Sequence, residues 1–187
     1  MNFLINKFPT TVEIDGEEVA INYDFRNCLK IILAFEDENL TDYEKVIVAL
    51  SLFYKEIPKN IISAEEKMIE FLNMGEKDKT SENEYRTYSL EKDAKYIYSG
   101  IQKTHNIDLN SEEDMHFWKF MNLFMELDEN CFFNQLVYLR KQKQKGKLTD
   151  YEKELYFSLG DVVEIKEKVL DKDSTEKLNK FYDLLER

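Results

Sequence analysis

His-Phe-Trp-Lys-Phe-Met-Asn-Leu-Phe-Met, residues 116–125, is the stretch of this sequence that decides its fold class. Large apolar residues recur there with a helical period, and a narrow polar stripe of His116, Lys119 and Asn122 interrupts them. Just upstream, Ser111 and Asp114 have the spacing of a helix cap. The stretch therefore predicts a helix that begins near residue 111 and is buried on most sides.

Helical patterns continue on both sides of this stretch. Helix starts are predicted at Asp24, at about Ser89 and Glu129, and at the capping-box pairs Thr41 with Glu44, Ser63 with Glu66 and Thr149 with Glu152. Residues 46–53, which follow the first of these boxes, are apolar on nearly all sides. We therefore expect their helix to be central and buried.

Residues 11–21 are the one region that predicts β-structure. Asp15-Gly16 suits a two-residue hairpin turn because both positions need positive φ angles. The resulting register places Val12 opposite Val19. It also places Ile14 opposite Glu17. The sequence predicts a mainly α fold, a helical bundle with an N-terminal β-hairpin.

The length of 187 residues fits a single domain, and the pattern divides it into two lobes. Residues 1–74 hold the hairpin and the first helices, and residues 89–187 form a helical lobe. The polar stretch 75–88 between them predicts a linker or mobile loop. Residues 162–187 predict one or two charged amphipathic helices.

The composition excludes several classes of function. A net charge of −12 disfavours binding to nucleic acids and to anionic membrane surfaces. No apolar run approaches the ~18 residues of a membrane span, and the first residues lack the pattern of a signal peptide. Cys28 and Cys131 lie in apolar surroundings, which is typical of reduced, buried thiols in the cytoplasm.

Motifs for catalysis and for cofactor binding are also missing from the sequence. Five scattered glycines form no phosphate-binding loop, and His105 and His116 have no metal-ligand spacing. Residues 171–175 begin like a calcium loop, but the sixth position is not glycine and the twelfth is Tyr182. We therefore expect no enzyme activity, no catalytic residue, no metal and no cofactor, and a function in binding another protein.

Two features are candidates for partner binding, and each has a structural alternative. The aromatic and methionine residues of 116–133 predict either core packing or an adaptable groove for a partner helix. The basic residues at 140–147 predict either stabilisation of a helix C-terminus or a docking patch for an acidic partner. The candidate contacts are Phe117, Trp118, Met121, Phe124, Met125, Arg140, Lys141, Lys143 and Lys145.

Several ordered stretches together resemble a known family. They are residues 21–27, 43–45, 53–54, 57–58, 64–67 and 71–72, then 90–98, 107–109, 116–120, 123–124, 127 and 138–140. In that order they resemble the gene-product-fifteen family of long-tailed bacteriophages and prophages, over about residues 8–160. One departure is Phe117, where the family pattern has a second tryptophan beside Trp118.

The resemblance implies a tail assembly chaperone. Such a protein coats the long, helical tape-measure protein, recruits tail-tube subunits in the host cytoplasm, and is absent from the mature virion. Two alternatives stay open: a structural tail component retained in the particle, and a small acidic regulatory module that binds a protein. The sequence is also compatible with self-association into a homo-oligomer.

Overall fold

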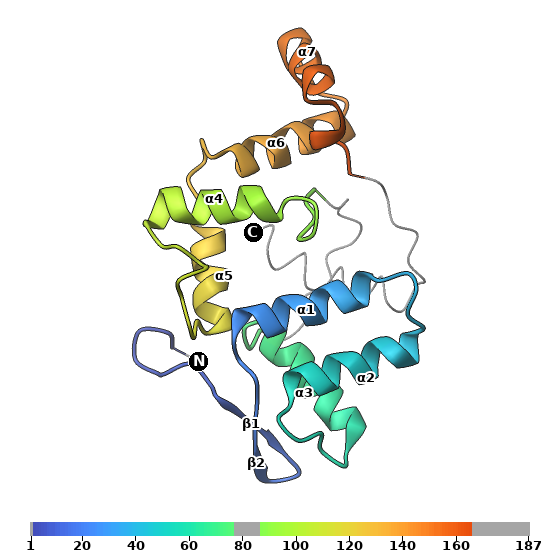
Figure 1. Ribbon diagram of the computed structural model, residues 1–187, viewed down its shortest axis with the longest axis vertical. Helices are drawn as coiled ribbons and strands as arrows, with labels where there is room; N and C mark the ends of the chain where they lie inside the picture. Colours follow the sequence, from blue (N-terminus) through green and yellow to red (C-terminus); the bar gives the residue numbers. More distant parts are fainter. Residues whose placement is uncertain (1, 77–86, 166–187) are drawn as a thin grey trace. The chain divides into compact units, whose positions relative to one another are not determined.

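The structure is a computed structural model that describes residues 2–76 and 87–165 (Figure 1). These residues form two compact units, of which the first comprises 2–76 and 114–121 and the second 87–113 and 122–165. The predicted linker falls largely in residues 77–86, and the predicted tail helices in 166–187, so both lie outside the described residues. Helices predominate in the described part, which confirms the mainly α fold class.

The first unit contains the predicted hairpin. Strands β1 (Thr11–Ile14) and β2 (Glu17–Ala20) pair antiparallel, with Val12 opposite Val19 and Ile14 opposite Glu17 as predicted. The turn residues Asp15 and Gly16 have φ angles of 52° and 83°. Positive φ at both central positions is what a turn of type I′ requires, and it fixes the register of the pair.

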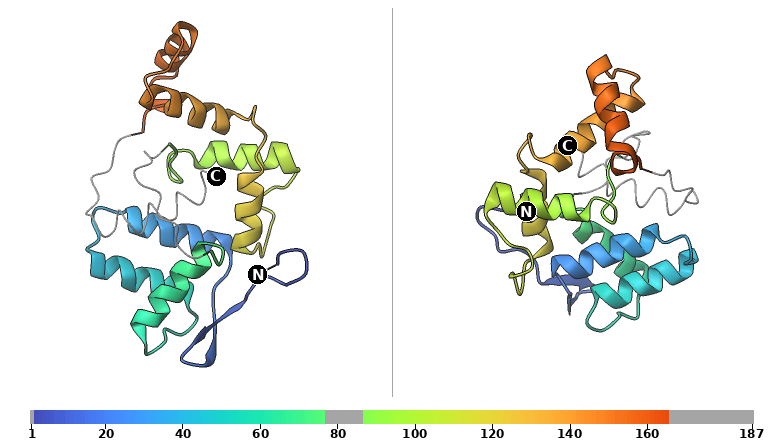
Figure 2. Two further views of the ribbon diagram at one scale, coloured as in Figure 1. Left: turned by 180° about the vertical axis from the view of Figure 1, so that it is seen from behind. Right: turned by 45° about the horizontal axis from the view of Figure 1, so that its top comes forward.

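Helices α1 (Phe25–Glu36), α2 (Asp42–Phe53) and α3 (Ile61–Leu72) follow the hairpin in the first unit, and they lie side by side in Figures 1 and 2. Asp24 caps α1 by accepting a hydrogen bond from the Arg26 N–H. Thr41 and Glu44 form the predicted capping box of α2. The buried apolar side chains of the three helices are Phe25, Cys28, Ile31, Ile32, Phe35, Ala49, Leu50, Phe53, Ala64, Met68, Phe71 and Leu72.

The prediction that residues 46–53 form a central, buried helix is wrong for one face of that helix. Ala49, Leu50 and Phe53 are buried, but Ile47 is 37% exposed. The physical reason is that α2 packs on α1 and α3 along one side, and its opposite side faces water. Apolar residues all round a helix do not require that every one be covered.

The start of α3 also differs from the prediction. Asn60 caps this helix, and its side-chain oxygen accepts the Ser63 N–H at 3.2 Å. The Asn60 amide also donates to the Asp15 carboxylate at 3.1 Å, which ties the helix start to the hairpin turn. Ser63 therefore lies inside the first turn and is not the cap that its spacing from Glu66 suggested.

The second unit is built around α4 (Ala94–His105), α6 (Phe132–Gln144) and α7 (Asp150–Leu159), followed by the short 3-10 helix η1 (Gly160–Val162). Helix α4 lies beside α6 (Figures 1 and 2). A small core of Leu136, Leu139, Tyr156 and Val163 joins α6 to α7 and η1. Thr149 caps α7 with the predicted box, whereas α4 begins later than predicted because residues 90–93 form turns. No helix in the described part of the chain has the length and apolarity needed to cross a membrane.

The hairpin turn generates a stability prediction. Gly16→Ala should lower the free energy of unfolding by about 1–2 kcal/mol, because alanine is strained at the positive φ of this position. No neighbouring atom lies within 4 Å of an added Cβ, so a steric clash does not contribute. Urea denaturation measures the effect, and Glu17→Ala in the exposed neighbouring position is the control. Equal stabilities of the two variants would contradict the assignment of the turn.

Candidate partner-binding site

The nine predicted partner contacts fall into buried and exposed groups. Phe117, Trp118 and Met121 are buried in the first unit, on helix α5 (Phe117–Met125), which begins there and ends in the second unit. Of the six predicted contacts in the second unit, Phe124 and Arg140 are buried, Lys141 is half-buried, and Met125, Lys143 and Lys145 are exposed. Burial indicates a structural role for five of the nine in this conformation, and partner binding stays a prediction for the set.

A backbone pairing sets the start of α5. The Phe25 N–H donates to the Met115 carbonyl at 3.0 Å, and the Phe117 N–H donates to the Tyr23 carbonyl at 2.8 Å. Asp24 and His116 thus form an antiparallel bridge. Because the backbone before Phe117 is committed to this pairing, the helix does not begin near residue 111 as predicted.

His116 takes the capping position of α5. Its Nδ1 accepts the Trp118 N–H at 3.0 Å, and its Nε2 donates to the Pro9 carbonyl at 2.9 Å. Both bonds require the neutral ring with its proton on Nε2. Burial lowers the pKa of His116, although the Pro9 carbonyl and Asp114 oppose this shift.

Trp118 is held in place by its own unit. The indole N–H donates to the Phe71 carbonyl at 2.8 Å, and the Phe71 ring lies 5.4 Å away between centroids. A Cβ added at Gly75 would lie 3.5 Å from the indole ring, so the backbone of Gly75 approaches it closely. Together with the stacked pair Tyr23 and His116, these rings form what we name the aromatic cradle: Tyr23, Phe71, His116 and Trp118.

Residues 2–9 cover the aromatic cradle. The Phe3 ring stacks on Trp118 at 5.3 Å with an interplanar angle of 14°. The centroid of the Phe8 ring lies 5.8 Å from that of Trp118 and 4.9 Å from that of His116. Sequence reasoning missed both phenylalanines, although two aromatic residues within the six positions before Pro9 were a usable signal.

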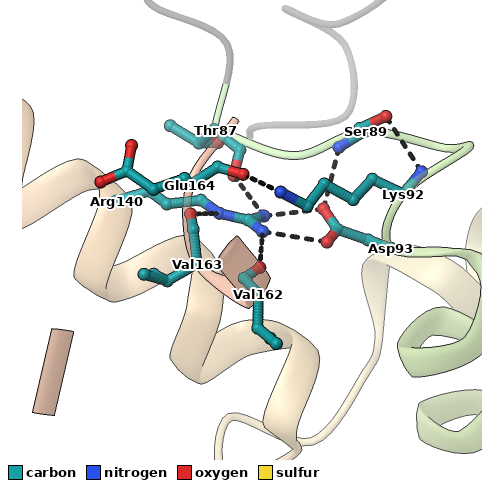
Figure 3. Close-up of polar contacts among 8 residues, drawn as sticks. All are labelled: Thr87, Ser89, Lys92, Asp93, Arg140, Val162, Val163 and Glu164. Carbon is teal, nitrogen blue, oxygen red and sulfur yellow. Dashed lines mark hydrogen bonds and ion pairs between the residues drawn. The ribbon is translucent and has the colours of Figure 1, made fainter. Parts of the chain in front are cut away.

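Arg140 lies at the centre of a polar cluster in the second unit (Figure 3). Its guanidinium forms a two-pronged ion pair with Asp93, at 2.7 and 2.9 Å. Its remaining donors reach the carbonyls of Val163 at 2.7 Å, and of Thr87 and Val162 at 3.1 Å each. All five N–H donors of the side chain are used inside the unit, so none is left for a partner in this conformation.

The contacts of the lysines near Arg140 fit the structural alternative, in which cations stabilise a helix C-terminus. Lys143 donates to the Tyr156 hydroxyl at 3.0 Å and pairs with Glu164 at 2.8 Å, and Glu164 raises the pKa of Lys143. Gly146 has a φ of 64°, and the Lys147 N–H bonds back to the Gln142 carbonyl, which ends α6. The basic run thus sits where cations stabilise a helix C-terminus.

The described residues offer little for metal or thiol chemistry. No three or more His, Cys, Asp or Glu side chains of residues 2–76 and 87–165 are grouped so as to hold a metal ion. Cys28 and Cys131 are free and buried, as predicted. Burial raises the pKa of the Cys28 thiol well above its usual range, which keeps it protonated and unreactive.

The buried His116 predicts a pH dependence of stability. Because folding lowers its pKa, the unfolded chain takes up the proton first, so this contribution is complete above about pH 6.5. It is lost as the pH falls from there through the lowered pKa of the folded state. Urea denaturation at about pH 7.5 and about pH 5.5 measures how much unfolding free energy is lost between the two pH values. The loss should be smaller for His116→Asn than for the native protein, because asparagine keeps a cap acceptor without titrating. Equal losses in both proteins would contradict the role of His116.

The Arg140 cluster predicts a large stability effect. Arg140→Ala leaves the buried Asp93 carboxylate without its cation, which should cost about 3–5 kcal/mol of unfolding free energy. Lys147→Ala, at an exposed position just beyond α6, is the control and should change stability by less than ~0.5 kcal/mol. Chemical denaturation measures both. A cost below ~1 kcal/mol for Arg140→Ala would rule out the cluster as a major stabilising element.

Comparison with known proteins agrees with the resemblance seen in the sequence. Residues 4–165 match the family described as bacteriophage Gp15 protein, which is most of the chain. No curated protein and no solved structure matches the chain significantly. The chain therefore belongs to the bacteriophage Gp15 protein family and is a phage-related protein.

Proposed function

We propose that this protein is a non-catalytic tail assembly chaperone, which transiently binds the tape-measure protein and recruits tail-tube subunits. Membership in the phage Gp15 family is the observation that carries the proposal. The chaperone acts in the host cytoplasm and leaves before the virion is complete. It needs no catalytic residue, metal or cofactor for this work.

The charge of the chain supports such a role. A chaperone for a long, aggregation-prone helical client has to remain in solution while it covers apolar surface. A net charge of −12 opposes self-association and keeps the complex of chaperone and client soluble.

Exposed apolar side chains supply contact surface for a client. Phe157 and Tyr151 on α7 are 81% and 74% exposed. Tyr43 on α2 and Ile62 on α3 are also exposed. Aromatic residues are enriched where proteins bind one another, because they bury a large area at a low cost in side-chain entropy.

Co-expression with the tape-measure protein of the same phage or prophage tests the proposal. We expect the tape-measure protein to become more soluble and to copurify with this chain. A tape-measure protein that is equally soluble and uncomplexed without this chain would refute the proposal.

Mass spectrometry of purified particles provides a second readout. The chaperone role predicts that this chain is absent from mature particles. Stoichiometric presence would instead favour a structural tail component retained in the particle.

A further inference from the structure

We propose that the aromatic cradle is a peptide-binding site which residues 2–9 occupy in cis, and from which a client segment bearing an aromatic side chain displaces them. The identity of the client rests on the proposed function. The site itself rests on the contacts of the first unit alone.

The cradle keeps its shape without its occupant. The Trp118 indole is tethered to the Phe71 carbonyl, and the Trp118 backbone N–H bonds to His116 Nδ1. Tyr23 stacks on His116 at 5.2 Å, and its hydroxyl lies 3.2 Å from the Asp114 carboxylate, to which it donates. None of these contacts involves residues 2–9. Removal of that segment therefore leaves a preformed aromatic surface beside an unused Nε2–H donor of His116.

Residues 2–9 are bonded mostly to themselves. The N–H groups of Ile5 and Asn6 donate to the Asn2 carbonyl, and the Leu4 N–H donates to the Asn2 side chain. Leu4 and Ile5 are 95% and 80% exposed. The segment thus forms a closed turn whose tip faces water.

This turn contacts the cradle through aromatic packing and one hydrogen bond. The Phe3 and Phe8 rings pack on Trp118 and His116, and the His116 ring donates to the Pro9 carbonyl. Aromatic contacts of this kind are individually modest. Release of the segment therefore disturbs little besides the rings that it covers.

The present occupant shows which chemistry the cradle accepts. It places one aromatic ring flat on the indole, a second against its edge, and a backbone carbonyl on His116. Residues 2–9 carry Lys7 and no acidic residue, whereas Asp24 and Asp114 lie beside His116. An extended client segment with an aromatic side chain and without acidic neighbours fits the same position.

Occupation of the cradle by residues 2–9 of the same chain lowers its affinity for a client. A client binds only the fraction of molecules in which the segment has left, so its apparent affinity falls by that fraction. Weakening the segment should therefore strengthen client binding, which is the opposite of what loss of a contact residue does.

Trp118 is the single tryptophan of the chain, and its fluorescence reports on the cradle. The double variant Phe3→Ala/Phe8→Ala should shift its emission to longer wavelength, because water reaches the indole. The double variant Leu4→Ala/Ile5→Ala is the matched control, since it changes the same turn at side chains that face water, and its emission should be native.

A synthetic peptide of residues 2–10 then tests binding in trans. We expect it to restore the emission of Phe3→Ala/Phe8→Ala and to leave the native chain unchanged, and the same peptide with both phenylalanines replaced by alanine should not bind. Unshifted emission of the double variant, or a failure of the peptide to restore it, would overturn the proposal. If circular dichroism shows that the double variant is unfolded, the same titration is made with Phe3→Ala, whose ring lies at the surface.

Binding measurements with the tape-measure protein distinguish a failure of this proposal from a failure of the proposed function. It should bind Phe3→Ala/Phe8→Ala about tenfold more tightly than the native chain, the effect of releasing ~1.4 kcal/mol of competition. Failure of the native chain and the variant alike to bind the tape-measure protein, with the peptide still binding, refutes the chaperone role and keeps the site. Equal or weaker client binding by the variant refutes displacement by the client.

Discussion

Two backbone hydrogen bonds between residues 23–25 and 115–117 join the two sequence segments of the first unit. They place the caps of α1 and α5, Asp24 and His116, opposite one another, so both helices begin at the same point in space. The orientation of Trp118 follows, because its backbone N–H is bound to the His116 ring. A side chain that a sequence pattern marks as a candidate contact is thereby turned onto Phe71 and covered by residues 2–9.

Arg140 plays a comparable part within the second unit, by different chemistry. A buried guanidinium is costly to remove from water, and it is tolerated here because a carboxylate and three carbonyls satisfy all of its donors. The same contacts hold Thr87 and residues 162–163 against α6, although these positions are far apart in sequence. In the sequence, the lysines that follow Arg140 belong to the same basic run. In the structure, they lie near the C-terminal end of α6, at the surface and not in the buried cluster.

Local rules made much of the fold predictable. The Asp15-Gly16 turn and the capping boxes at Thr41 and Thr149 depend on residues within a few positions, and the structure confirms all three. The box at Ser63 failed because Asn60 competes for the helix start and gains a bond to Asp15. The cradle was beyond prediction for the same kind of reason: the Trp118 indole is bound to the Phe71 carbonyl, which is 47 positions away.

The discontinuity of the first unit has a consequence for synthesis on the ribosome. Residues 2–76 lack their pairing partners until residues 114–121 have been made, so the aromatic surface of Phe71 and Tyr23 has no Trp118 or His116 to pack on during that interval. Pairings between distant residues form late, because the intervening chain has to be closed into a loop. The aromatic packing of the first unit therefore cannot be completed before residues 87–113 of the second unit have been made.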